Sequence, residues 1–116
     1  MNDKKRILKQ LKMGTTEVLI LVILTRDDQY GYEISRDVVE RSGGYFELKQ
    51  GFLYPTLRRM EQAKLLRGYW KSSSSGGPNR RYYRLTRKGK SQLGATIEAW
   101  AQFSKKFNQM LAGRKK

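Results

Sequence analysis

The 116-residue sequence contains neither cysteine nor histidine. Without cysteine there is no disulfide framework and no thiolate metal site, and without histidine the commonest metal ligand and proton shuttle is missing. Acidic residues are also few, ten against 25 lysines and arginines, and they show no metal-site spacing. Catalysis would have to rest on carboxylate, lysine, serine or tyrosine side chains. These absences predict a protein that is not an enzyme and that holds no metal or other cofactor.

Long hydrophobic runs are missing as well. The longest, Val18 to Leu24, has seven residues and is too short to cross a bilayer. The first residues, which include Lys4, Lys5 and Arg6, lead into no hydrophobic region typical of a secretory signal. We therefore expect a cytoplasmic protein that does not enter a membrane.

Positive charge is what the sequence has in excess. The formal net charge is +15, and from Gln50 onward 16 basic residues face only Glu61 and Glu98, which places +14 in that part. Such a one-sided excess favours nucleic acid or another polyanion as partner. A chain of this length forms one domain, with or without an appendage, and a shared subunit interface would add to the small surface that it buries.

The order of the predicted elements indicates the fold class. Helical periodicity covers residues 4–25, 30–41, 50–64 and 87–111, and the first of these is one helix or two abutting helices because Gly14 interrupts it. Two short runs rich in tyrosine and tryptophan, 65–72 and 80–85, predict a β-hairpin with a long tip. We therefore predict a mainly α fold with a small β-hairpin. It comprises a winged helix-turn-helix domain over residues 1–86 and a C-terminal dimerisation helix with a basic tail over residues 87–116.

Pro55 affects the start of the third helix. Leu53, Leu57 and Met60 share one face of that helix and point to the core. Proline is tolerated in the first turn of a helix and damaging deeper inside it. The sequence therefore places the start of this helix at Phe52 to Tyr54.

Three ordered motifs carry a family resemblance over residues 14–90. The segment Gly51 to Glu61, GFLYPTLRRME, resembles the recognition-helix signature of the PadR family of bacterial transcriptional regulators. Tyr69-Trp70 with Arg80 to Gly89 resembles that family's wing, and Tyr30 to Ile34 is similar to the start of its second helix. Lys64 departs from the pattern, since the family often has a glycine there. The single C-terminal helix resembles the small subfamily that senses multiple drugs.

The resemblance implies binding to double-stranded DNA, and residue chemistry indicates which side chains bind it. With Leu53, Leu57 and Met60 buried, the side chains of the recognition helix left outside are Gln50, Tyr54, Thr56, Arg58 and Arg59. Arg58 or Arg59 suits guanine and Gln50 suits adenine, whereas Tyr54 either touches the DNA or packs at the helix start. Further expected contacts, to phosphates or the adjacent minor groove, are Tyr32, Arg36, Lys71, Arg80 and Arg81. Strand alternation lets only some of the hairpin residues face DNA.

The last helix carries an apolar seam that predicts a homodimer. Its members are Leu93, Ile97, Trp100, Phe103, Phe107 and Leu111. The subfamily resemblance further implies a pore between two symmetry-related tryptophans that accepts flat aromatic compounds. Carried over by position, the residues of that pore are Glu17, Val18, Leu93, Thr96, Ile97 and Trp100.

The sequence thus supports one main hypothesis and one alternative. The main hypothesis is a homodimeric regulator, a repressor, that binds a pseudo-palindromic operator and is released by a planar aromatic ligand. The alternative is a basic DNA- or RNA-binding or architectural protein that is indifferent to sequence and senses no ligand.

Overall fold

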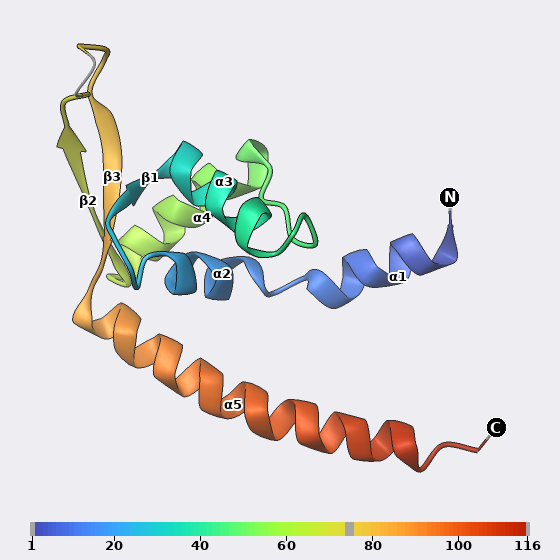
Figure 1. Cartoon of the computed structure of the whole chain (residues 1–116). Helices are drawn as coiled ribbons and strands as arrows, with labels where there is room; N and C mark the ends of the chain where they lie inside the picture. The colour runs from blue at the N-terminus through green and yellow to red at the C-terminus, as the bar shows by residue number, and fades with distance from the viewer. Residues whose placement is uncertain (1, 74–75, 116) are drawn as a thin grey trace.

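The structure is a computed structural model that describes residues 2–73 and 76–115. Five helices and three strands follow one another in these ranges: α1 (Asp3–Lys12), α2 (Thr16–Ile23), β1 (Gln29–Tyr30), α3 (Gly31–Arg41), α4 (Gln50–Gln62), β2 (Leu66–Lys71), β3 (Arg80–Leu85) and α5 (Arg87–Ala112). Residues 74 and 75, which belong to the predicted hairpin tip, lie outside the described residues. The helix order and the hairpin agree with the predicted fold class (Figure 1).

Gly14 divides the N-terminal helical segment in two. Its φ of 85° lies in the left-handed region, which glycine enters without the steric penalty of a Cβ atom. The second of the two sequence interpretations, two abutting helices, is therefore correct. At the C-terminal end of α1, before the break, the Lys12 ammonium donates a hydrogen bond to the Tyr45 carbonyl and lies 4.3 Å from the centroid of the Tyr45 ring. This contact ties α1 to the connection that leads into α4.

The predicted start of α4 is wrong. The helix begins at Gln50, so Pro55 is its sixth residue. The amides of Phe52 and Leu53 both donate to the Lys49 carbonyl at 2.9 Å and close the first turn before the proline is reached. Burial of Leu53 on the inner face then outweighs the one hydrogen bond that Pro55 cannot make.

The C-terminal end of α4 has the geometry that a glycine usually supplies. Lys64 has a φ of 67°, and the next amide, of Leu65, donates to the Met60 carbonyl at 2.9 Å. This is the Schellman arrangement, which satisfies the last carbonyls of a helix. Lys64 therefore forms the same helix end that a glycine would form at this position.

The hairpin is part of a three-stranded antiparallel sheet with the order β1-β3-β2. Trp70 pairs with Arg81 and Lys71 with Arg80 along β2 and β3. Strand β1 was not predicted, because a strand of two residues is too short to show alternation. It pairs Tyr30 with Tyr82 and so joins the start of α3 to the hairpin.

One hydrophobic core holds together the winged-helix head, which comprises α2, α3, α4 and the three-stranded sheet. It combines residues from α2, α3, α4, the hairpin and the start of α5: Ile20, Leu21, Ile34, Leu53, Leu57, Met60, Leu66 and Leu93 are among its members. Helix α5 touches this core only through its first two turns. At Gly89 an added Cβ would lie 2.3 Å from the Leu65 carbonyl oxygen, so the approach of α5 to the head requires glycine.

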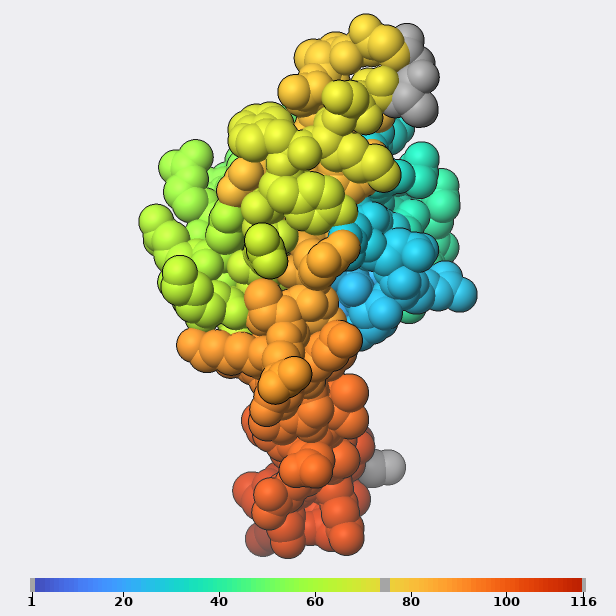
Figure 2. Space-filling view, turned by 90° about the vertical axis from the view of Figure 1, so that its left-hand side faces the viewer, coloured from blue at the N-terminus to red at the C-terminus, as the bar shows by residue number. Residues whose placement is uncertain are grey.

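Beyond Leu93, helix α5 leaves the head. The helix has 26 residues, which corresponds to a length of about 39 Å. It gives the molecule its extended dimensions of 61 × 35 × 22 Å. Figure 2 shows the hairpin and α5 at opposite ends of the molecule, with the head between them.

Candidate nucleic-acid interface

Helix α4 is surrounded on three sides by its own chain. Its inner face is buried in the core, and on one flank the Arg59 guanidinium lies 3.7 Å from Glu17 of α2. On the other flank the Tyr54 ring covers Gly31 of α3, and the Glu61 carboxylate accepts a 2.6 Å hydrogen bond from Arg81 of β3. The fourth side of α4 faces solvent, and the start of the helix lies on the side of the head away from α5 (Figure 1).

The solvent-facing strip of α4 contains one predicted DNA-binding residue, Arg58, together with three residues outside the predicted set, and a second predicted residue, Gln50, lies beside it at the N-terminal end of the helix. Gln50 and Arg58 belong to the predicted set, whereas Gly51, Pro55 and Gln62 do not; all five residues are exposed. A helical wheel centred on the buried residues would have found the additional three, since they lie opposite Leu53 and Met60. This strip is the part of α4 that another molecule can reach without displacing the chain's own contacts.

The expectation that Thr56 faces outward is wrong. The residue is 2% exposed, and its hydroxyl donates to the Phe52 carbonyl at 2.7 Å. Thr56 lies three residues after Leu53 and four before Met60, so it belongs to the inward face of the helix. A small hydroxyl that bonds to its own backbone is tolerated there, and it is not available to DNA.

Arg59 and Tyr54 lie on the two flanks of the strip. Arg59 is directed toward α2, where Glu17 partly neutralises it, and one of its Nη atoms donates to the Thr56 hydroxyl at 3.3 Å. Tyr54 is 44% exposed, and its ring packs over Gly31. Of the two uses left open by the sequence, the structure shows that Tyr54 packs on a neighbouring helix, and contact with DNA stays a prediction. Of the two arginines offered for guanine, Arg58 is therefore the one on the open strip.

On α3, both predicted phosphate contacts are exposed. Tyr32 is 54% exposed, and the Arg36 guanidinium lies 5.9 Å from the centroid of its ring. Arg36 also has an ion pair of 3.8 Å with the neighbouring Asp37. An exposed pair of this kind is weak, so it leaves Arg36 free to exchange partners.

The three predicted hairpin residues divide between the two faces of the sheet. Arg81 shares a face with Trp70 and forms a close ion pair with Glu61 of α4. Arg80 and Lys71 lie on the other face, where Arg80 donates to the Tyr30 hydroxyl at 3.1 Å. Lys71 lies 5.1 Å from the centroid of the Tyr82 ring and remains exposed. Arg81 therefore has a structural role in fixing the hairpin against α4.

At the base of the hairpin, Asp28 holds both strands. Its carboxylate accepts from the Tyr69 hydroxyl at 2.6 Å and from Arg84 at 3.0 Å. The hydrogen bond to the Asp28 carboxylate raises the pKa of Tyr69 above its ordinary value of 10.0. Burial raises the pKa of Tyr83, on the core side of β3. Asp28 thus ties both strands of the hairpin to the segment that precedes β1.

A groove of about 410 Å³ separates α4 from α2 and α5. Three of the six predicted ligand residues, Glu17, Val18 and Thr96, line it. Phe52 and Arg59 of α4 line it as well and were missed, because the resemblance refers only to the first and last helices. Ligand contacts at this groove would therefore reach the recognition helix directly.

The remaining three predicted ligand residues do not line that groove. Leu93 is 8% exposed and packs in the core of its own chain, so its predicted roles at an interface and in a pore are wrong for this side chain. The reason is its position two turns into α5, where the helix still lies on the head. Ile97 and Trp100 follow it on the part of α5 that has left the head, and they are 59% and 60% exposed.

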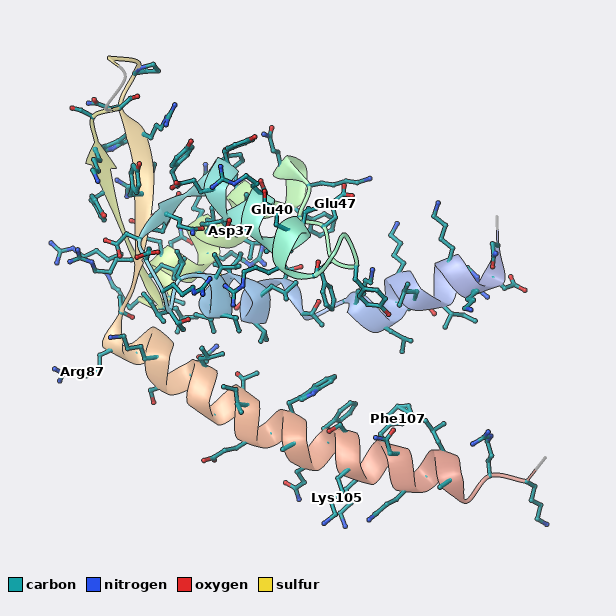
Figure 3. The ribbon with its side chains drawn as sticks, viewed as in Figure 1. Asp37, Glu40, Glu47, Arg87, Lys105 and Phe107 are labelled. Carbon is teal, nitrogen blue, oxygen red and sulfur yellow. The ribbon has the colours of Figure 1, made fainter. Side chains whose placement is uncertain are left out.

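Beyond Leu93, the apolar seam of α5 is solvent-exposed. The aromatic and aliphatic side chains that form it after Leu93 are Ile97, Trp100, Phe103, Phe107, Met110 and Leu111, each at least 43% exposed. The three aromatic rings contact one another in series, with centroids 5.7 and 5.8 Å apart. Phe107 and Lys105 lie on opposite sides of the helix, and Phe107 is on the side toward α1 (Figure 3). Helix α1 exposes two apolar side chains of its own, Ile7 and Leu11.

Comparison with known protein families identifies the chain. The family described as "Transcriptional regulator PadR-like family" matches residues 20–95, which include α3, α4, the hairpin and the start of α5. The protein belongs to the PadR-like family. The resemblance inferred from the motifs around Tyr30, Gly51 and Arg80 is thereby confirmed.

Several known proteins are similar to this chain over most of its length. A PadR family transcription regulator of Clostridium difficile R20291 is 41% identical, with a TM-score of 0.75 over 84% of this chain and 99% of that one. A PadR-like transcriptional regulator of Bacillus cereus is 36% identical, with a TM-score of 0.75 over 90% and 99% of the two chains. Uncharacterized protein X of Lysinibacillus sphaericus is 32% identical over 100 residues, which are 86% of this chain and 91% of that protein.

Membership in the PadR-like family establishes the general activity. The protein is a transcriptional regulator that acts through DNA binding, and the family consists of regulators rather than enzymes. The winged-helix fold with a C-terminal helix is the one predicted from the sequence. Across residues 2–73 and 76–115, no helix is long and apolar enough to cross a membrane.

Proposed function

We propose that this PadR-family regulator is a sequence-specific repressor that binds a pseudo-palindromic operator as a homodimer. The observation that carries this proposal is the open strip of α4, with Arg58 on it and Gln50 beside it, both exposed, between flanks occupied by α2, α3 and β3. Gln50 pairs with adenine and Arg58 with guanine in the major groove. Tyr32, Arg36 and Lys71 bind phosphates beside the strip and set the register of the head on the duplex.

The proposed dimer uses the apolar seam of α5. An exposed series of Ile97, Trp100, Phe103 and Phe107 on one helix face is too large to remain in water in a chain of this length. A second copy related by a two-fold axis covers that face with its own seam. In this arrangement residues 1–86 form the DNA-binding unit and residues 87–116 the dimerisation unit, apart from Leu93, which belongs to the core of the head.

A planar aromatic ligand between the paired tryptophans releases the operator in this proposal. Trp100 offers an exposed ring at the seam, and the groove beside Glu17, Val18 and Thr96 connects the region to α4 through Arg59. Such a ligand lowers operator affinity only if it binds more tightly to the dimer arrangement that fits DNA poorly.

The first test is selection of duplexes from a random-sequence library by the wild-type protein. At 150 mM salt we expect the selected duplex to bind at least about 1,000-fold more tightly than a scrambled duplex of equal composition. We also expect two half-sites whose centres are separated by about one helical turn. Equal affinity and an equal salt slope for both duplexes would identify a sequence-indifferent basic protein and refute the repressor, because nonspecific binding is almost entirely counterion release.

The second test addresses the ligand through Trp100 emission. The variant Trp70→Phe leaves Trp100 as the single tryptophan, and we expect its emission to change with proflavine, lumichrome or 1-pyrenesulfonate, three flat compounds of different charge. An active compound should also release the selected duplex from the wild type and not from Trp100→Ala, a control that separates protein binding from intercalation into DNA. Unchanged emission with all three compounds contradicts ligand sensing and leaves DNA recognition unaffected.

A further inference from the structure

Gly51 lies in the first turn of α4, at the start of the open strip. The residue is exposed, and a Cβ atom built on it would meet nothing within 4 Å. Its φ is outside the left-handed region, so the backbone conformation accepts any L-amino acid. Within a helix, glycine is less stable than alanine because it loses more conformational freedom on folding. The fold of the chain therefore gives no reason for glycine at this position.

Most other glycines of the described chain have an evident local reason. Gly31, Gly68 and Gly89 have neighbouring atoms 2.8, 2.6 and 2.3 Å from the position of a Cβ. Four more have left-handed φ values: Gly14, Gly43, Gly44 and Gly76. Among helical glycines with a normal φ, only Gly51 and Gly94 have no atom within 4 Å of a Cβ across residues 2–73 and 76–115. Gly94 lies on the side of α5 that also carries Glu98 and Lys105, away from the apolar seam.

The residues around Gly51 extend this bare surface. Pro55, one turn later, is exposed and has no N–H, so it cannot donate the usual helical hydrogen bond to the Gly51 carbonyl. The next residue on the same face is Arg58, and Gln50 precedes Gly51. Gln50 at the start of the helix and Arg58 on the strip thus lie on either side of main chain at Gly51 that no side chain covers.

We infer that operator DNA approaches the α4 main chain at Gly51 closely enough to exclude a methyl group. This inference rests on the proposed DNA-binding function of α4 and makes Gly51 a positioning residue that sets how deeply Gln50 and Arg58 enter the major groove. Bidentate contacts to bases require donor–acceptor distances of about 2.7–3.2 Å. A methyl group at position 51 holds the helix away from the base edges by more than this tolerance and weakens both contacts together.

The test compares Gly51→Ala with Gly94→Ala, the same change at an equally open helical position remote from the strip. Both variants should raise the thermal midpoint by about 2–4 °C, since alanine reduces the freedom of the unfolded chain. Only Gly51→Ala should bind the selected duplex about 10- to 100-fold more weakly, while its affinity for scrambled DNA stays within about twofold of wild type. A methyl group that raises the thermal midpoint and lowers the affinity for the operator shows that DNA, and not the fold, requires glycine at position 51.

Three outcomes contradict the inference, and they are distinguishable. Gly51→Ala binding the selected duplex with wild-type affinity shows that DNA does not approach residue 51, although the repressor proposal stands. A lower thermal midpoint for Gly51→Ala shows that the fold itself requires this glycine. A wild-type protein that selects no preferred duplex removes the proposed function and, with it, this inference.

Discussion

Phe107→Asp is expected to convert the proposed dimer into monomers and to lower affinity for the selected operator duplex by at least about 100-fold. Phe107 lies on the exposed seam of α5, in contact with Phe103, and a partner's seam would bury it. A carboxylate in that position would have to be desolvated without a cation beside it, which is strongly unfavourable. Loss of the dimer leaves each head to bind one half-site alone and removes the gain in effective concentration that linkage of two heads provides.

Sedimentation equilibrium at micromolar protein measures the oligomeric state, and fluorescence anisotropy with the labelled duplex measures the affinity. Gln109→Asp is the matched control, because it introduces the same charge two residues away on the opposite side of α5. The control should remain dimeric and bind normally. A Phe107→Asp protein that stays dimeric would place the subunit interface elsewhere and contradict the proposed use of the seam.

Arg58→Ala is expected to weaken binding to the selected duplex by about 10- to 100-fold and to abolish preference at one base pair. Arg58 is the exposed arginine of the open strip, whereas Arg59 is directed toward Glu17. A bidentate arginine–guanine contact contributes about 1–3 kcal/mol of discrimination, which corresponds to this range. Anisotropy titrations against a set of duplexes with single base-pair changes identify the base pair that Arg58 reads.

Arg87→Ala is the control for charge alone. It removes the same side chain at the start of α5, at the far end of the head from the hairpin tip (Figure 3). Its affinity for the selected duplex should remain within about twofold of wild type. Equal losses for Arg58→Ala and Arg87→Ala, without a change in base preference, would mean that Arg58 supplies only general electrostatic attraction and reads no base.

The features that agree with the prediction are those whose signals are local. The exposure of Gln50 and Arg58 follows from helical spacing, and the hairpin follows from two aromatic runs around a serine- and glycine-rich tip. The prediction for Thr56 is wrong because its polar hydroxyl favours an outward position, whereas its spacing from Leu53 and Met60 places it on the buried side. The polarity of the side chain indicates an outward orientation and the helix geometry an inward one. The inward orientation prevails because the neighbouring apolar side chains on that face are buried in the core.

Pro55 and Leu93 show a different kind of error. A proline rule based on isolated helices moved the start of α4 past Gln50, but packing of Leu53 in the core stabilises the earlier start. Leu93 has the spacing of the seam and also the position of a core residue, and spacing alone cannot tell which surface a helix meets first. Only the path of α5, which stays on the head through Gly89 and Leu93, separates the two roles.

The order of the helices, the hairpin, the family and the excess of positive charge follow from the sequence alone, because each of these depends on short-range spacing and composition. Which of the charged side chains remain unpaired depends instead on how the chain folds. Glu17 and Glu61 are distant in the chain from the arginines they meet, and folding brings them to Arg59 and Arg81 while Arg58 stays open. Contacts between residues far apart in the chain depend on how the elements pack, and no local pattern encodes them.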